Sequence, residues 1–170
     1  MEALRHSLFA PSVTTIFMVF GCAHGILEMV KLRYACKDDN GKPLLPHPYE
    51  PWNAPTDPKY KDSVDAVYRA FKMVENIKEW TFLSLPIMWV FALYGGALPY
   101  MTDAIMEGII LASGAAYCVG NYWYVNGYIE SAAKRLKGFQ VRRRVFEFWL
   151  LGSLASVVWG GLIRYGIVNA

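Results

Sequence analysis

The chain has 170 residues, of which 55% are hydrophobic, 15% aromatic and only 18% charged. Because an average soluble protein carries about 25% charged residues, this composition disfavours a water-soluble enzyme, and its hydrophobicity excludes disorder. The net charge of +3 does not indicate nucleic-acid binding. The length fits one domain covering 1–170. The three cysteines lie too far apart for a disulfide framework or a CxxC metal site.

Four apolar stretches have about the length needed to cross a bilayer. We therefore expect an all-α integral membrane protein with four transmembrane helices. We expect the first stretch to be retained, because no signal-peptide cleavage site follows it. The four stretches cover residues 8–30, 80–100, 104–128 and 145–168.

The first stretch contains His24 and Glu28, four residues apart and thus on one helix face. Intramembrane polar groups usually pair or reach the interface, so we interpret both as interfacial or helix-contacting groups. No further histidine lies in the spans, and we expect no metal site. The connection that follows, 37–58, holds six of the nine prolines. Its proline content favours an extended path that is able to dock a partner.

A second helix is predicted from Asp62, with Asp62 or Ser63 as its N-cap. It begins outside the membrane and enters it near Trp80. Spacings of three and four residues place a set of polar side chains on one face of this helix. The members of this stripe are Arg69, Lys72, Asn76 and Glu79.

The third helix is expected to leave the membrane near Tyr128 and to continue to Lys137, with Gly138 as its C-cap. On such a helix Tyr124, Tyr128 and Arg135 share one face, since eleven residues make about three turns. Each stripe also has a simpler interpretation. The tyrosines are typical of an aromatic belt. Lys134, Arg135, Lys137 and the basic triplet 142–144 are typical of topology determinants or lipid-phosphate contacts. Asn76 and Glu79 are typical of solvated helix surface.

The basic residues are distributed asymmetrically along the chain. The connections before the second span and after the third hold fifteen of the seventeen lysines and arginines, whereas the connection between these two spans holds none. The positive-inside rule then places the two basic connections on the cytoplasmic or equivalent side and both termini on the other. The polar stripes of the second and third helices are expected to project on this basic side.

Together the two stripes suit a small ligand with both amine and carboxylate groups. Arginine and lysine bind carboxylates, Glu79 binds an ammonium group, and Asn76 pairs with a peptide group. A cation such as Arg135 beside a thiol favours the thiolate, which is the nucleophilic form.

The segment Tyr124-Val-Asn-Gly127-Tyr128, followed by Arg135 seven residues after the second tyrosine, resembles a known family. This family is the membrane-associated proteins in eicosanoid and glutathione metabolism, and the segment is closest to microsomal glutathione transferases of types two and three. The resemblance implies that Tyr124 and Tyr128 bind glutathione and that Arg135 stabilises its thiolate.

The second helix matches the family pattern Arg-Ala-x-x-Asn-x-x-Glu in either of two frames. Arg69-Ala70 resembles its start, but the asparagine then falls three residues late. Aligning Asn76 and Glu79 instead puts Lys72 in place of the arginine, and we prefer this frame. A lysine is a point charge rather than a bidentate fork, and the family's proline after the glutamate is missing.

The resemblance implies a left-handed four-helix bundle that forms a homotrimer in the endoplasmic reticulum or a mitochondrial membrane. It also implies glutathione as co-substrate, with no metal, and membrane lipid and a lipophilic substrate as partners. The expected activity is a glutathione-dependent transferase or peroxidase acting on lipophilic electrophiles or lipid hydroperoxides. The alternative is a non-catalytic relative that binds lipid or serves as an accessory subunit of a larger membrane complex. The departures on the second helix and the proline-rich loop favour this alternative.

Overall fold

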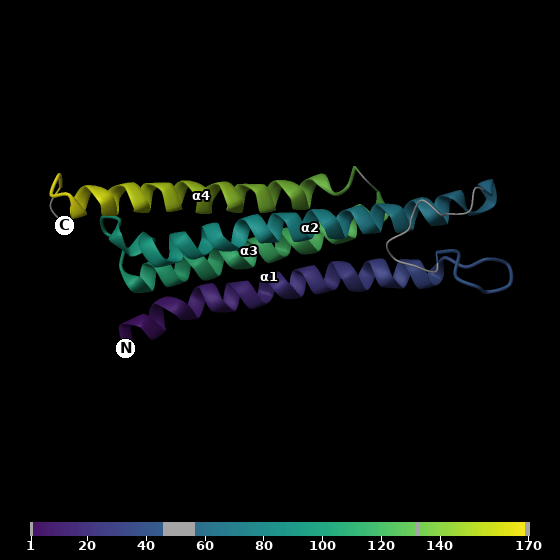
Figure 1. Cartoon of the computed structure of the whole chain (residues 1–170), viewed down its shortest axis with the longest axis horizontal. Helices are drawn as coiled ribbons and strands as arrows, with labels where there is room; N and C mark the ends of the chain where they lie inside the picture. Colours follow the sequence, from purple (N-terminus) through teal and green to yellow (C-terminus); the bar gives the residue numbers. More distant parts are fainter. Residues whose placement is uncertain (1, 46–56, 132, 169–170) are drawn as a thin grey trace.

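The computed structural model of the chain describes residues 2–45, 57–131 and 133–168. Within these residues it is all-helical, with four long helices running side by side (Figure 1). Each helix is long and apolar enough to cross a membrane. The expected all-α integral membrane protein is therefore confirmed at this level. The helices are α1 (Glu2–Ala35), α2 (Lys61–Tyr94), α3 (Asp103–Glu130) and α4 (Leu136–Arg164).

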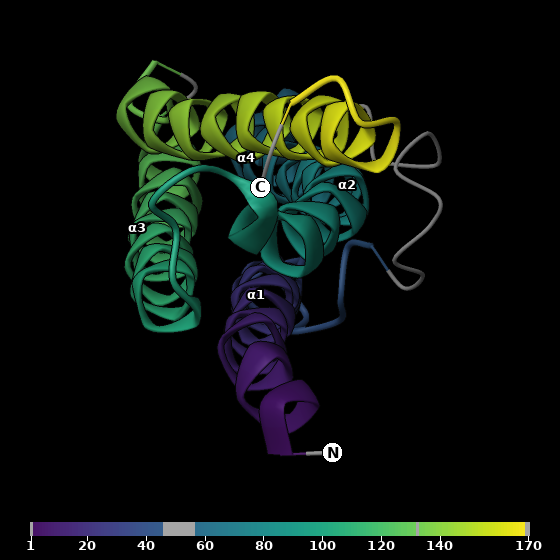
Figure 2. The same ribbon diagram turned by 90° about the vertical axis from the view of Figure 1, so that its left-hand side faces the viewer.

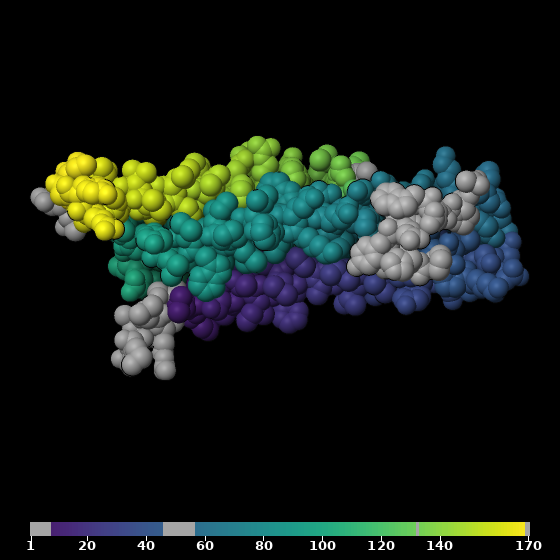
Figure 3. Space-filling view, viewed as in Figure 1, coloured from purple at the N-terminus to yellow at the C-terminus, as the bar shows by residue number. Residues whose placement is uncertain are grey.

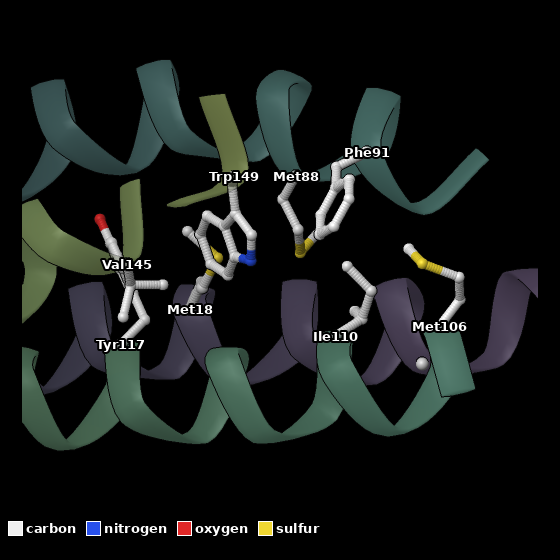
Figure 4. Close-up of a cluster of buried hydrophobic side chains, with 9 residues drawn as sticks. Met18, Met88, Phe91, Met106, Ile110, Tyr117, Val145 and Trp149 are labelled. Carbon is white, nitrogen blue, oxygen red and sulfur yellow. The ribbon is translucent and has the colours of Figure 1, made fainter. Parts of the chain in front are cut away.

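Helices α2 and α3 form the centre of the bundle. Seen along its length, α1 lies on one side of them and α4 on the other (Figure 2). Apolar side chains from all four helices point into the interior, where Met18, Met88 and Trp149 are fully buried (Figure 4). The outer faces of α1 and α4 remain apolar and exposed, with Phe20 and Leu151 among many such residues. An outward-facing apolar surface of this kind is expected for a bundle surrounded by lipid.

Polar side chains inside the bundle satisfy one another across helices. The indole Nε1 of Trp149 donates to Ser113 Oγ at 2.8 Å, and that of Trp89 donates to Thr15 Oγ1 at 3.0 Å. Such interhelical hydrogen bonds stabilise helix association in lipid, where burial of apolar surface gives no driving force.

The predicted start of the second helix differs from the structure, and the fourth helix extends beyond its predicted apolar stretch. Helix α2 begins at Lys61, directly after a 3₁₀ turn (Pro58–Tyr60) that Asp57 caps by accepting from the Lys59 amide at 2.9 Å. Asp62 and Ser63 therefore lie inside the helix rather than at its cap. Helix α4 begins at Leu136, well before the predicted span, because its first turns carry the basic residues outside the apolar segment.

The predicted helix ends differ as well. Helix α2 ends at Tyr94 rather than near residue 100, because Gly95 opens a 3₁₀ turn (Gly95–Ala97). Helix α4 ends at Arg164, ahead of Gly166 with its left-handed φ of 68°. Four of the loop prolines, Pro46, Pro48, Pro51 and Pro55, lie outside the described residues.

The first and third connections lie toward the same end of the bundle, as the charge pattern predicts, and both termini lie toward the other end (Figure 1). The end of α1 and the start of α2, rather than α2 and α3, project beyond the α3–α4 turn. There Cys36, Leu45 and Val67 form a small buried cluster. In Figure 3 the α2 surface lies between α4 along one edge and α1 along the other.

Candidate functional site

A cavity of about 250 Å³ lies near the basic end of the bundle. Asn76 of α2, more than forty positions away in the sequence, lines it together with residues of α3, the α3–α4 turn and the first turn of α4. Residues predicted from both polar stripes meet in it. The lining residues are Asn76, Tyr124, Arg135, Leu136 and Phe139.

Arg135 reaches the cavity from the turn rather than from α3. Helix α3 ends at Glu130, and Ser131 adopts an extended conformation, so the predicted continuous helix to Lys137 is wrong. The turn folds back tightly over Gly127, where an added Cβ would lie 2.5 Å from the carbonyl oxygen of Lys134. This close approach brings the Arg135 guanidinium to 4.9 Å from the centroid of the Tyr128 ring.

Gly138 is not a C-cap but lies inside α4, buried against α3. An added Cβ would lie 2.2 Å from the backbone nitrogen of Tyr124 and 2.5 Å from the carbonyl oxygen of Gly120. The two helix backbones therefore nearly touch at this point. Because only glycine permits that contact, Gly138 fixes how closely Phe139 and Leu136 approach Tyr124 across the cavity.

The two predicted tyrosines are both buried and contact each other edge to face, with ring centroids 5.5 Å apart. Their one-turn spacing on α3 aligns them along the helix axis. Tyr124 lines the cavity directly, whereas Tyr128 borders it through its contact with Arg135.

The α2 stripe contributes unequally to the cavity. Asn76 lines it and donates its Nδ2 to the carbonyl of Lys72 at 2.8 Å, which leaves Oδ1 as an acceptor. The Lys72 ammonium forms an ion pair with Glu75 at 2.8 Å, and the Arg69 side chain is half-buried. Neither Lys72 nor Arg69 lines the cavity. Glu79 is exposed and does not line the cavity.

Arg142 is the residue of this region that the sequence interpretation missed. It is only 1% exposed, and its guanidinium lies 4.6 Å from the Tyr124 ring centroid and 5.8 Å from those of Trp80 and Tyr117. None of its three side-chain nitrogens has a hydrogen-bond partner among the described residues. A buried charge without a partner is costly, so its presence requires a physical explanation.

A signal for the burial of Arg142 exists in the sequence. Arg142, Val145 and Trp149 follow one another at spacings of three and four, which places all three on one helix face. The basic run Arg142–Arg144 is predicted as a whole to be a topology determinant. Arg143 and Arg144 fit that interpretation, since both are exposed and pair with Glu147.

The polar pair of the first span lies apart from the cavity. Glu28 forms an ion pair with Lys31 at 2.5 Å, and the ring of His24 stacks on Tyr122 with centroids 5.9 Å apart. His24 therefore contacts a neighbouring helix, as predicted. Asn121, one turn before Tyr124, is buried against Gly21 of α1, and its side-chain nitrogen and oxygen have no partner within the described residues.

Comparison with known proteins adds little to this geometry. No family model matches the chain. An uncharacterized protein of Synechocystis is 29% identical over 91 residues, which make up 54% of this chain. The aligned region spans 59% of that protein's length.

Proposed function

We propose that the protein is a glutathione-dependent transferase or peroxidase of the membrane-associated eicosanoid and glutathione family, closest to the microsomal transferases of types two and three. One observation carries the proposal: Arg135 lines one cavity with Tyr124 and Asn76 and contacts Tyr128. These four residues come from both segments that resemble the family's glutathione-binding motifs.

In this proposal Arg135 is the catalytic residue. Its guanidinium favours the thiolate of bound glutathione over the thiol, and the S–H proton passes to water at the basic end of the bundle. The thiolate then attacks a lipophilic electrophile that enters from the bilayer. With a lipid hydroperoxide it attacks the O–O bond, giving the alcohol and a glutathione sulfenic acid, which a second glutathione converts to the disulfide and water.

The remaining residues hold the tripeptide. Asn76 Oδ1 accepts from a peptide N–H, Glu79 binds the ammonium group, and Arg69 and Lys72 bind the carboxylates. The Lys72–Glu75 pair is half-exposed, and such pairs contribute about 0–1 kcal/mol. A ligand carboxylate can therefore replace Glu75 at little cost.

We also propose that the active assembly is a left-handed bundle trimer in the endoplasmic reticulum or a mitochondrial membrane. The cavity of about 250 Å³ is smaller than the roughly 300–1,000 Å³ of most ligand pockets. Glu79 is exposed on a single chain. A neighbouring copy that covers Glu79 would enlarge the site to the size a tripeptide needs.

A specific observation favours the alternative of a non-catalytic accessory or lipid-binding protein. The end of α1 and the start of α2 project beyond the α3–α4 turn and carry the separate cluster of Cys36, Leu45 and Val67 (Figure 1). A projecting end with its own core is suited to docking a partner subunit.

The experiment that tests the proposal is difference absorbance at about 240 nm, where a glutathione thiolate absorbs while the thiol does not. Purified wild-type protein is expected to give the signal, and Arg135→Ala to lose it. Arg144→Ala is the matched control, because Arg144 is exposed and pairs with Glu147 away from the cavity. The absence of a signal from wild type, or equal signals from wild type and Arg135→Ala, contradicts the proposal.

A further inference from the structure

Arg142 forms a caged cation next to the cavity. Rings from two other helices surround its guanidinium: Trp80 from α2, and Tyr117 and Tyr124 from α3. Cation–π contacts of this kind stabilise a desolvated guanidinium, which explains how the charge is tolerated without a carboxylate. Because no anion pairs with it among the described residues, its field is not cancelled locally.

Tyr124 connects this cation to the cavity. Its ring centroid lies 4.6 Å from the Arg142 guanidinium, and the same residue lines the cavity. The charged and titratable groups beside Tyr124 are the Arg142 guanidinium of α4, 4.6 Å from its ring centroid, the Tyr128 ring of α3 at 5.5 Å, and Arg135 of the turn, which lines the same cavity. Among these groups Arg142 is the only fully buried charge.

We propose that Arg142 is a positioning residue that stabilises an anionic sulfur in the cavity through the Tyr124 hydroxyl. A cation near an aromatic ring draws electron density from the phenol and makes its O–H a stronger hydrogen-bond donor. The thiolate accepts that hydrogen bond, and the S–H proton leaves to water. In the low dielectric of the bundle interior the effect of the charge is strong. This inference rests on the proposed function.

The first test is a pH titration of the thiolate absorbance at about 240 nm in wild type, Arg142→Gln and Arg142→Lys. Loss of the charge is expected to raise the pKa of bound glutathione by about one unit, which is tenfold in the thiolate-to-thiol ratio. Lysine keeps the charge and is expected to restore most of that ratio. An unchanged pKa in Arg142→Gln, or no rescue by lysine, overturns the proposal.

The second test separates action through Tyr124 from a general effect on the fold. Tyr124→Phe is expected to lose about the same tenfold, since it removes the donor. In that background, adding Arg142→Gln is expected to change the thiolate ratio by less than about twofold, as for two residues acting as one unit. A full additional tenfold loss in the double variant overturns the proposal. An unchanged pKa of bound glutathione in Tyr124→Phe also overturns the proposal. This outcome can be measured even if Arg142→Gln does not fold.

Failure of this inference is distinguishable from failure of the proposed function. Wild-type protein without any thiolate signal overturns both. A wild-type signal that Arg135→Ala abolishes but that neither Arg142→Gln nor Tyr124→Phe shifts overturns only the role of Arg142.

Discussion

The contact between Gly138 and α3 allows a prediction about stability. In Gly138→Ala the new Cβ would lie 2.2 Å from the Tyr124 nitrogen and 2.6 Å from its Cα, whereas ordinary contacts begin at 3.4 Å. The obstructing atoms are backbone, so no side chain can rotate away. Helix α4 must then move away from α3 by about 1 Å. Overpacking of this kind lowers the free energy of unfolding by up to about 3 kcal/mol.

Alanine also has a higher helix propensity than glycine, which returns up to about 1 kcal/mol. We therefore expect Gly138→Ala to destabilise the bundle by about 2 kcal/mol, since the overpacking cost exceeds this gain. For a protein of this size that corresponds to a midpoint about 4–8 °C lower in thermal unfolding. The assay is circular dichroism or tryptophan fluorescence in detergent micelles.

The matched control is Gly161→Ala on the same helix, where an added Cβ meets nothing within 4 Å. We expect this variant to unfold at or slightly above the wild-type midpoint, because it gains helix propensity without a clash. A Gly138→Ala midpoint equal to that of Gly161→Ala would refute the close approach of α3 and α4.

Two further predictions concern the core and the loop. Trp149 is fully buried and donates a hydrogen bond to Ser113, so Trp149→Ala should lower the free energy of unfolding by about 3–5 kcal/mol in the same micelle assay. Leu151→Ala is the control, because Leu151 is exposed. Equal losses in the two variants would contradict the assigned core. The Lys59 ammonium, with the Tyr60 hydroxyl, holds the pKa of the exposed Asp39 carboxyl below its ordinary value. The Lys59–Asp39 pair therefore stabilises the folded loop at pH values above the ordinary carboxyl pKa. This stabilisation is lost as the pH falls through the lowered pKa of Asp39. A carboxyl ¹³C titration of Asp39 should therefore shift to higher pH in Lys59→Gln, and an unchanged midpoint would contradict the pair.

Much of the candidate site was predictable from local pattern. The spacing of Tyr124 and Tyr128 on a helix, and of Asn76 on its neighbour, depends only on helical geometry. The proximity of Arg135 to the tyrosines was also predicted, but for the wrong reason. A helical face was expected to align them, whereas a turn that folds over Gly127 does so.

The sequence by itself determined that the chain is a four-helix membrane protein with both basic connections at one end. Apolar length and charge asymmetry along the chain are sufficient for that, because the bilayer imposes the length of a span. Only the tertiary structure decided which polar residues meet. Whether Arg142 faces water or the bundle depends on the close contact at Gly138 and on rings supplied by α2 and α3. The sequence places Arg142 on the same helix face as Val145 and Trp149, but it does not show which rings of α2 and α3 pack against that face.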